Sequence, residues 1–345
     1  MTPERFQEIA SKYPKLRVAV VGDFCLDRYL ELDPARAETS IETGLPVYNV
    51  VNVRAQPGGA GTIVNNLVAL GVGTIIPVSF RGDDGEGYEL ERGLGRLPGL
   101  RLDHFLTAPE RRTFTYCKPL LVEPGKPPVE LNRLDSKNWT RTPPELEARL
   151  AESLRAVAPA VDAIIVLEQV DAPETGVVTR ALLDVLGEIA EARPALPILA
   201  DSRQGLRGWP PVSFKMNAAE LATLLGRSGD HELDDVKEAA SQMAVQQGRP
   251  VFVTLSERGI VAAGPGPGIA AEHVPSLPLR GPIDIVGAGD SVTANLAAAL
   301  AAGASLREAI AVASIASSHV IHQLGTTGTA SVADIGALLS QLPGA

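Results

Sequence analysis

Short runs of β-branched and other apolar residues alternate along the chain with longer segments of helical length and composition. The runs predicted as strands cover residues 17–21, 74–79, 163–167, 197–200, 251–255 and 260–263. The segments predicted as helices cover residues 85–97, 144–157, 175–192, 233–247, 288–302 and 306–323. Such alternation is typical of βαβ units, in which helices cover a mostly parallel sheet. The sequence therefore predicts an α/β fold.

Two segments interrupt this rhythm, residues 29–53 and 113–134. Each contains strand-like pieces broken by proline, glycine and charged residues, and we expect them to pair into a small second sheet that acts as a lid on the main sheet. Residues 1–345 are thus expected to form a single domain with a β-lid. A GPGPG sequence at 264–268 indicates a hairpin or loop, and the residues after Gly325 predict a loop and a short final helix.

Composition narrows the classes of protein further. The 345 residues are 45% hydrophobic and 21% charged, which is typical of a folded globular chain. A net charge of −10 gives little attraction for nucleic acid or an anionic membrane, so neither partner is expected. The chain has only two cysteines and no apolar segment of signal-peptide or membrane-spanning character. We therefore expect a cytoplasmic protein.

The strongest chemical signal is the sequence DIVGAGDS at residues 284–291, which leads into a helical run of small residues. Gly287 and Gly289 let a ligand approach the backbone, and the amides at a helix start attract an anion. Asp290 lies in the first turn, where the helix dipole is expected to keep it ionised. A carboxylate there can accept the proton of a hydroxyl that attacks phosphorus. The alternative is a tight turn in which Asp290 only caps the helix.

Three further short motifs accompany this octet. A PGGAG sequence at 57–61 precedes a helix-like segment; taken alone it fits an ordinary turn or a weak dinucleotide loop. The first predicted strand does not run into the GxGxxG of a dinucleotide-dependent oxidoreductase, but into a turn from Gly22 to Asp27. The sequence NAAE begins at Asn217, and it also fits a helix start in which Asn217 and Glu220 cap each other.

Together, and in the order in which they occur along the chain, the four motifs resemble those of the PfkB/ribokinase family of sugar and nucleoside kinases over residues 16–335. Residues 22–29, 46–47 and 57–60 are most similar to the kinase domain of the bifunctional heptose-phosphate kinase/adenylyltransferase, and the nucleotidyltransferase half is not expected here. The resemblance implies a ribokinase-like three-layer α/β/α sandwich with a small β-sheet lid. It also implies transfer of the γ-phosphoryl group of ATP to a hydroxyl of a sugar or sugar phosphate, with Mg²⁺, and a homodimer formed through the lid.

The resemblance also assigns roles to individual residues. It implies that Asp290 is the catalytic base and that Gly287, Ala288 and Gly289 form an anion hole. The residues expected to bind the sugar are Asp23, Asp27, Gly58, Gly59, Thr62 and Arg203. The residues expected to bind the nucleotide are Asn217, Glu220, Thr254, Ser256 and Gly259, with Glu220 reaching Mg²⁺ through water.

Several positions depart from the family pattern. Thr62 stands where many members have an asparagine that touches the sugar, and Ser256 stands where a glycine is common. Glu168 lies in a segment where heptose kinases show Ser-Asp-Tyr. These departures leave open a catalytically impaired nucleotide- or sugar-binding protein of the same fold. Asp284 falls where some members bind a monovalent cation, and the acceptor is not determined.

Three basic residues are candidates for binding a phosphate group on the acceptor. Arg203 keeps a positive charge where heptose kinases have a lysine, and it could contact a phosphate already on the sugar or be solvated. Arg111 and Arg112, before the second lid-like segment, are weaker candidates for the same contact.

Overall fold

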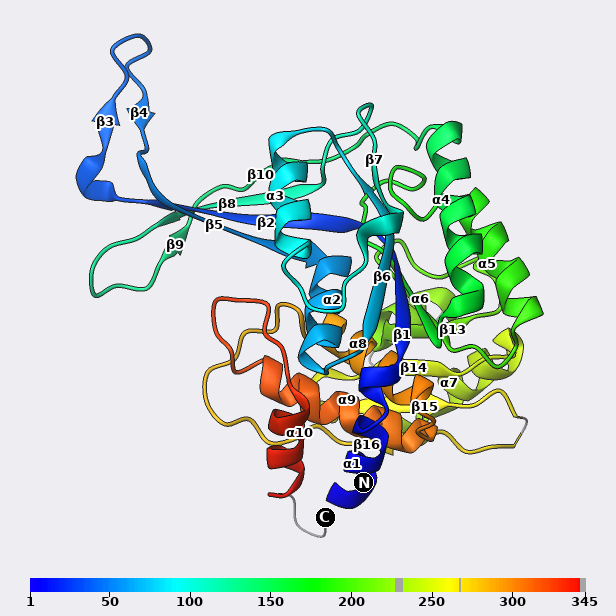
Figure 1. Ribbon diagram of the computed structural model, residues 1–345. Coiled ribbons are helices and arrows are strands. Elements are labelled where there is room, and N and C mark those ends of the chain that lie inside the picture. Colours follow the sequence, from blue (N-terminus) through cyan, green and yellow to red (C-terminus); the bar gives the residue numbers. More distant parts are fainter. Residues whose placement is uncertain (227–231, 267, 342–345) are drawn as a thin grey trace.

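A large mixed sheet forms the centre of the computed structural model, which describes residues 1–226, 232–266 and 268–341 (Figure 1). In spatial order its strands are β16 (Glu272–Val274), β15 (Ile260–Ala263), β14 (Val251–Thr254), β13 (Ser213–Asn217), β12 (Ile198–Ser202), β11 (Ala163–Glu168), β1 (Arg17–Gly22), β6 (Thr74–Arg81) and β7 (Phe105–Thr107). The strands from β14 to β7 run parallel, and β15 and β16 are antiparallel to their neighbours.

Helices cover both faces of this sheet. One face carries α1 (Pro3–Ala10), α2 (Ala60–Ala69), α3 (Gly85–Leu94), α8 (Ala288–Ala301), α9 (Leu306–Val320) and α10 (Val332–Leu339). The other carries α4 (Pro144–Val157), α5 (Arg180–Ala192), α6 (Ala218–Leu225) and α7 (Leu233–Gln247). Because side chains of a strand alternate between faces, Val18 and Val20 of β1 enter the first core while Ala19 and Val21 enter the second. The expected three-layer α/β/α fold is confirmed.

The predicted elements of the main sheet are all present, with shifts at their ends. The helix expected to begin at residue 175 begins at Arg180, and residues 175–179 form a loop before it. Strand β13 was not predicted, since Lys215 interrupts its apolar pattern. Residues 264–268 lie between the antiparallel strands β15 and β16, with residue 267 outside the described part of the chain. No helix in the described ranges has the length and apolar character to cross a membrane.

A second, smaller sheet projects from the side of the molecule (Figure 1). Its strands are β10 (Leu134–Ser136), β8 (Thr115–Leu121), β2 (Phe24–Leu32) and β5 (Val50–Gly59), with β9 (Val129–Glu130) also paired to β8. Beyond it, β3 (Glu38–Thr39) and β4 (Pro46–Val47) form a protruding hairpin. The long strands extend past the range 29–53 on both sides, because β2 begins directly after β1 and β5 continues to the start of α2.

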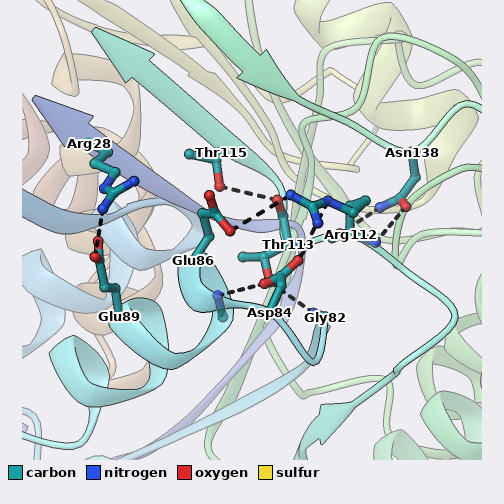
Figure 2. Close-up of polar contacts among 10 residues, drawn as sticks. Arg28, Gly82, Asp84, Glu86, Glu89, Arg112, Thr113, Thr115 and Asn138 are labelled. Carbon is teal, nitrogen blue, oxygen red and sulfur yellow. Dashed lines mark hydrogen bonds and ion pairs between the residues drawn. The ribbon is translucent and has the colours of Figure 1, made fainter. Parts of the chain in front are cut away.

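Asp84 anchors the chain that leads into this small sheet, as Figure 2 shows. It caps α3 by accepting from the Gly87 amide at 2.8 Å, and it accepts from the amide and hydroxyl of Thr113 at 2.9 and 2.6 Å. The Arg112 guanidinium lies 3.7 Å from the Asp84 carboxylate. The backbone amide of Arg112 donates to the side-chain oxygen of Asn138, whose side-chain amide donates back to the Arg112 carbonyl. The guanidinium of Arg112 is therefore directed toward Asp84 and Glu86.

The junction between the two sheets depends on Gly22. Its φ is +140°, and a Cβ there would lie 2.0 Å from the carbonyl oxygen of Leu167 in the adjacent strand. The following residue, Asp23, donates its amide to that same carbonyl at 3.1 Å. Only glycine lets the chain leave β1 this close to β11 and enter β2 after one residue.

We expect Gly22→Ala to lower the free energy of unfolding by about 3 kcal/mol or more, because the added methyl group meets rigid backbone. Gly71→Ala is the matched control: Gly71 also has a positive φ, of +74°, but a Cβ there has no neighbour within 4 Å. Its cost should be limited to about 1 to 2 kcal/mol of backbone strain. Urea unfolding of both variants measures the difference, and equal losses would contradict the steric explanation.

Candidate active site

The octet at residues 284–291 forms the loop and first turn that open α8. Gly287 caps this helix with a φ of +81°. The Ser291 amide donates to the Gly287 carbonyl at 2.9 Å, and the Ala288 amide donates to Ile285 at 3.2 Å. Among the described residues, no acceptor forms a hydrogen bond with the Gly289 or Asp290 amide. Two unpaired donors at a helix start suit a bound oxyanion, such as a phosphate.

Asp290 is half-buried in the first turn of α8. Loss of solvent raises its pKa to about 7, with Asp201 and Asp27 adding to the rise and Lys215 opposing it. The expectation that Asp290 stays ionised was therefore wrong, because burial and the like charges of Asp201 and Asp27 leave it only partly ionised near neutral pH. A carboxylate with this pKa can both accept and release a proton near neutral pH.

Two residues beside Asp290 were missed as site residues. Lys215 of β13 is buried and donates to the Asp201 carboxylate of β12 at 2.7 Å. Its ammonium would lie 3.1 Å from a Cβ on Gly289, so it rests against the start of α8. Burial opposes the charge of Lys215, but Asp201 and Asp290 outweigh that effect and raise its pKa. A lysine inside a short apolar run, directly before the NAAE motif, was the available signal.

Asp27 lies on the small sheet with Gly58 beside it. The two residues come from the paired strands β2 and β5, and a Cβ on Gly58 would lie 2.4 Å from the Asp27 carboxylate. The side chain of Asp27 therefore occupies the space that the missing side chain leaves. Burial raises the pKa of Asp27, while Lys118, 3.8 Å away, opposes the rise.

Gly59 and Thr62 connect the small sheet to the octet. Gly59 caps α2, and a Cβ there would lie 2.6 Å from the Asp23 carbonyl. Thr62, in the first turn of α2, is buried, and its methyl group would lie 3.4 Å from a Cβ on Gly287. The glycine loop and the octet, more than 200 residues apart in sequence, are thus in contact.

Asp23 has a different position from the other residues expected to bind the sugar. Its two carboxylate oxygens accept backbone hydrogen bonds from Val177 at 2.7 Å and Gln169 at 2.8 Å. Burial raises its pKa, although these hydrogen bonds oppose the rise. Asp23 therefore holds the loop after β11 against the start of β2.

Asn217 and Glu220 form a capping box at the start of α6. The Asn217 side chain accepts from the Glu220 amide at 2.9 Å, and the Glu220 carboxylate accepts from the Asn217 amide at 2.8 Å. The interpretation of NAAE as a helix start is therefore confirmed. Within the described residues, only one Glu220 oxygen has a hydrogen-bond partner, so the other is available to a ligand.

Thr254 lies directly opposite Asn217, because β13 and β14 pair them in register. The turn that follows contains Ser256, which has a φ of +51°. This left-handed conformation explains why glycine is common there. At Gly259 a Cβ would lie 2.0 Å from the Val274 carbonyl, which excludes any side chain. The residues expected to bind the nucleotide thus cluster at the ends of β13 and β14.

Arg203 follows β12 and reaches the small sheet. It donates to the hydroxyl of Tyr116, at 3.0 Å, and Tyr116 stands opposite Asp27 in the strand register. Arg133 and Lys137 lie over the Tyr116 ring, 4.7 and 5.7 Å from its centroid. Three cations therefore gather around Tyr116, the strand neighbour of Asp27.

Other sequence candidates have different positions. Arg111 is buried, and its guanidinium donates to the carbonyls of Thr140, Arg141 and Thr175, so it braces loops rather than facing a ligand. Asp284 accepts from the Val286 amide at 3.0 Å and the Gly325 amide at 3.1 Å.

Glu168 is buried at the end of β11 and accepts a hydrogen bond from Ser202. Burial raises its pKa to about 7, with the nearby Asp23 carboxylate adding to the rise. Glu168 is therefore a buried residue at the end of a central strand, close enough to Asp23 for the two carboxylates to repel each other.

Comparisons with known proteins identify the fold and the family of this chain. Solved structures with the same fold include Arabidopsis thaliana ribokinase complexed with ribose and ATP, with a TM-score of 0.64 and 16% identity, covering 95% of this chain and 99% of that one. Escherichia coli phosphofructokinase-2 in complex with fructose-6-phosphate has a TM-score of 0.66 and 18% identity, covering 95% and 99%. The TM-scores over nearly the whole of both chains establish a shared fold.

Curated relatives are closer in sequence. The chain is 31% identical to the bifunctional protein HldE of Rhodospirillum rubrum over 323 residues, covering 92% of this chain and 61% of the relative. It is 29% identical to the same-named protein of Pelobacter propionicus, covering 94% and 64%. The chain thus spans less than two thirds of these relatives. The family model described as "pfkB family carbohydrate kinase" matches residues 15–333. The chain therefore belongs to the pfkB family of carbohydrate kinases.

Proposed function

We propose that this protein transfers the γ-phosphoryl group of ATP to a hydroxyl of a sugar or sugar phosphate. The observation that carries the proposal is the start of α8, where the unpaired amides of Gly289 and Asp290 adjoin a carboxylate with a pKa of about 7. Asp27 on the small sheet acts electrostatically on the same carboxylate, so an acceptor bound there would lie close to it. Membership of a carbohydrate kinase family supports this combination.

The mechanism follows from the chemistry of these groups. Asp290 accepts the proton of the attacking hydroxyl, and the Gly289 and Asp290 amides, with Gly287 and Ala288 shaping the turn, stabilise negative charge on the transferred group. ATP supplies the phosphoryl group, and a bound Mg²⁺ would supply positive charge to balance that of its phosphates. The free oxygen of Glu220 fits a magnesium ion bound through water.

The remaining residues position the two substrates. Asn217, Thr254, Ser256 and Gly259 would line the nucleotide site at the ends of β13 and β14. Asp27 would accept hydrogen bonds from sugar hydroxyls, with Gly58, Gly59 and Thr62 leaving room beside it. The small sheet would act as a lid that excludes water, which could otherwise be phosphorylated in place of the sugar.

We expect Asp290→Asn to fold normally and to lose about 10²- to 10⁴-fold in turnover, because the amide cannot accept the proton. The measurement is ADP release over a panel of phosphorylated and unphosphorylated sugars and nucleosides. Near-normal turnover in the variant would refute the assignment of the base. ATP binding by the unaltered protein without ADP release on any acceptor would favour the catalytically impaired alternative.

The acceptor is further proposed to carry an anionic group such as a phosphate. Arg203, Arg133 and Lys137 gather around Tyr116, whereas the carboxylates paired with them are Asp135 and Asp171. This local excess of positive charge next to Asp27 suits a sugar phosphate.

Arg203→Ala should therefore raise KM for a phosphorylated acceptor by about 10-fold or more, as expected for loss of a charged hydrogen bond. KM for the unphosphorylated sugar should change much less. Arg207→Ala is the matched control, since Arg207 is an exposed neighbour that donates to the Leu224 carbonyl. Equal effects of Arg203→Ala on both acceptors would contradict the phosphate contact.

A homodimer through the small sheet is also proposed. Strand β5 is at the edge of this sheet, and exposed apolar side chains follow it and the adjoining hairpin: Ile41, Leu45, Tyr48, Val51 and Val53. An exposed edge with apolar side chains favours pairing with a second copy.

Val51→Asp should weaken the dimer by about tenfold or more, because a charge is then buried at the contact. Val245→Asp is the control, since Val245 is similarly exposed but lies on α7. Sedimentation velocity over a range of concentrations measures the dissociation constant. A monomer at all micromolar concentrations of the unaltered protein would refute the dimer.

A further inference from the structure

Three carboxylates lie near the start of α8, and one buried lysine lies with them. Asp290 comes from α8, Asp201 from the end of β12 and Asp27 from the small sheet; Asp201 and Asp27 both disfavour the charged form of Asp290. In the described part of the chain, Lys215 is the cation that acts on Asp290. Without it, burial and repulsion would place a proton on the carboxylate.

Lys215 is held in place rather than free to swing. Its ammonium donates to Asp201 at 2.7 Å, and both side chains are largely removed from solvent. Asp201 is in turn 3.5 Å from the Thr293 hydroxyl, which donates to the Gly289 carbonyl at 3.0 Å. This chain of contacts fixes the ammonium relative to the first turn of α8. The absence of a side chain at Gly289 leaves room for its approach.

A buried lysine at this position contributes little to the stability of the fold. The neighbouring positions Phe214 and Met216 of β13 are buried in the apolar core, and a buried ion pair is often no more stabilising than apolar residues of similar size. A charge retained beside a reactive carboxylate therefore points to a function for that charge.

We propose that Lys215, fixed by Asp201, is a positioning residue whose ammonium supplies the counter-charge that keeps Asp290 in its anionic, proton-accepting form. This inference rests on the proposed function of Asp290 as the base. The other charged or titratable groups around the pair are Asp27 and Cys25 from β2 and Glu220 from α6. The Asp27 and Glu220 carboxylates are acidic, so they do not replace the ammonium.

The inference predicts opposite effects for the two partners. Lys215→Met removes the counter-charge. The midpoint of the acid limb of the pH profile of kcat/KM should therefore shift to higher pH by about 1 pH unit or more, and activity should recover partly at high pH. Asp201→Asn removes a like charge and releases Lys215 toward Asp290, so the midpoint of this limb should shift to lower pH. Substrate titration is the same for every variant, so differences between profiles report on the protein.

Two further variants serve as controls. Lys215→Arg keeps the charge and should keep the limb close to that of the unaltered protein. The double variant K215M/D201N removes both charges and should lie between the single variants. If both single variants move the limb in the same direction or not at all, the inference is overturned. Should Lys215→Met fail to fold, the profile of Asp201→Asn decides: a downward shift supports the inference, and an unchanged or raised limb overturns it.

Asp290→Asn separates this inference from the proposed function. If that variant is inactive while the limb does not respond to Lys215 or Asp201, only the counter-charge is wrong. If Asp290→Asn turns over at the normal rate, the proposed function itself fails.

Discussion

The close approach of β1 and β11 at Gly22 determines how the two sheets meet. The chain passes from the last residue of β1 to the first of β2 through Asp23 alone, whose amide binds the Leu167 carbonyl and whose carboxylate holds the loop at 169–177. Because this junction is so short, the direction of the small sheet is set by the backbone of the central one. The position of Asp27 relative to α8 follows from it.

Electrostatics is the second constraint on the site. The carboxylates of Asp290, Asp201 and Asp27 come from separate parts of the chain, and each is partly or fully withdrawn from water. Such a group can exist only with a balancing cation nearby or with protons bound. The ion pair between Lys215 and Asp201 joins two neighbouring strands at their carboxyl ends, where ligand sites of parallel α/β sheets usually occur.

The sequence predicts the strands and helices well where periodicity is unbroken, and it predicts the start of α8 from its glycines. It did not predict β13, because a charged residue stands where an apolar one was expected. Nor does it predict that Asp201, Lys215 and Asp290 converge, since their proximity arises from strand order and not from local spacing. The protonation of Asp290 was misjudged for the same reason: helix position is local, whereas its charged neighbours are distant in sequence.

Helix α8 is made mostly of small side chains, and its residues from Ser291 to Ala299 are buried on every side, between α2, α9 and the sheet. A rod packed this tightly has no free space in which to slide or rotate. The small sheet, by contrast, projects from the body of the molecule and is joined to it through short connections (Figure 1). The Asp290 carboxylate, carried by the first turn of this helix, therefore has a fixed support, and its distance from the small sheet is set by the sheet and not by the helix.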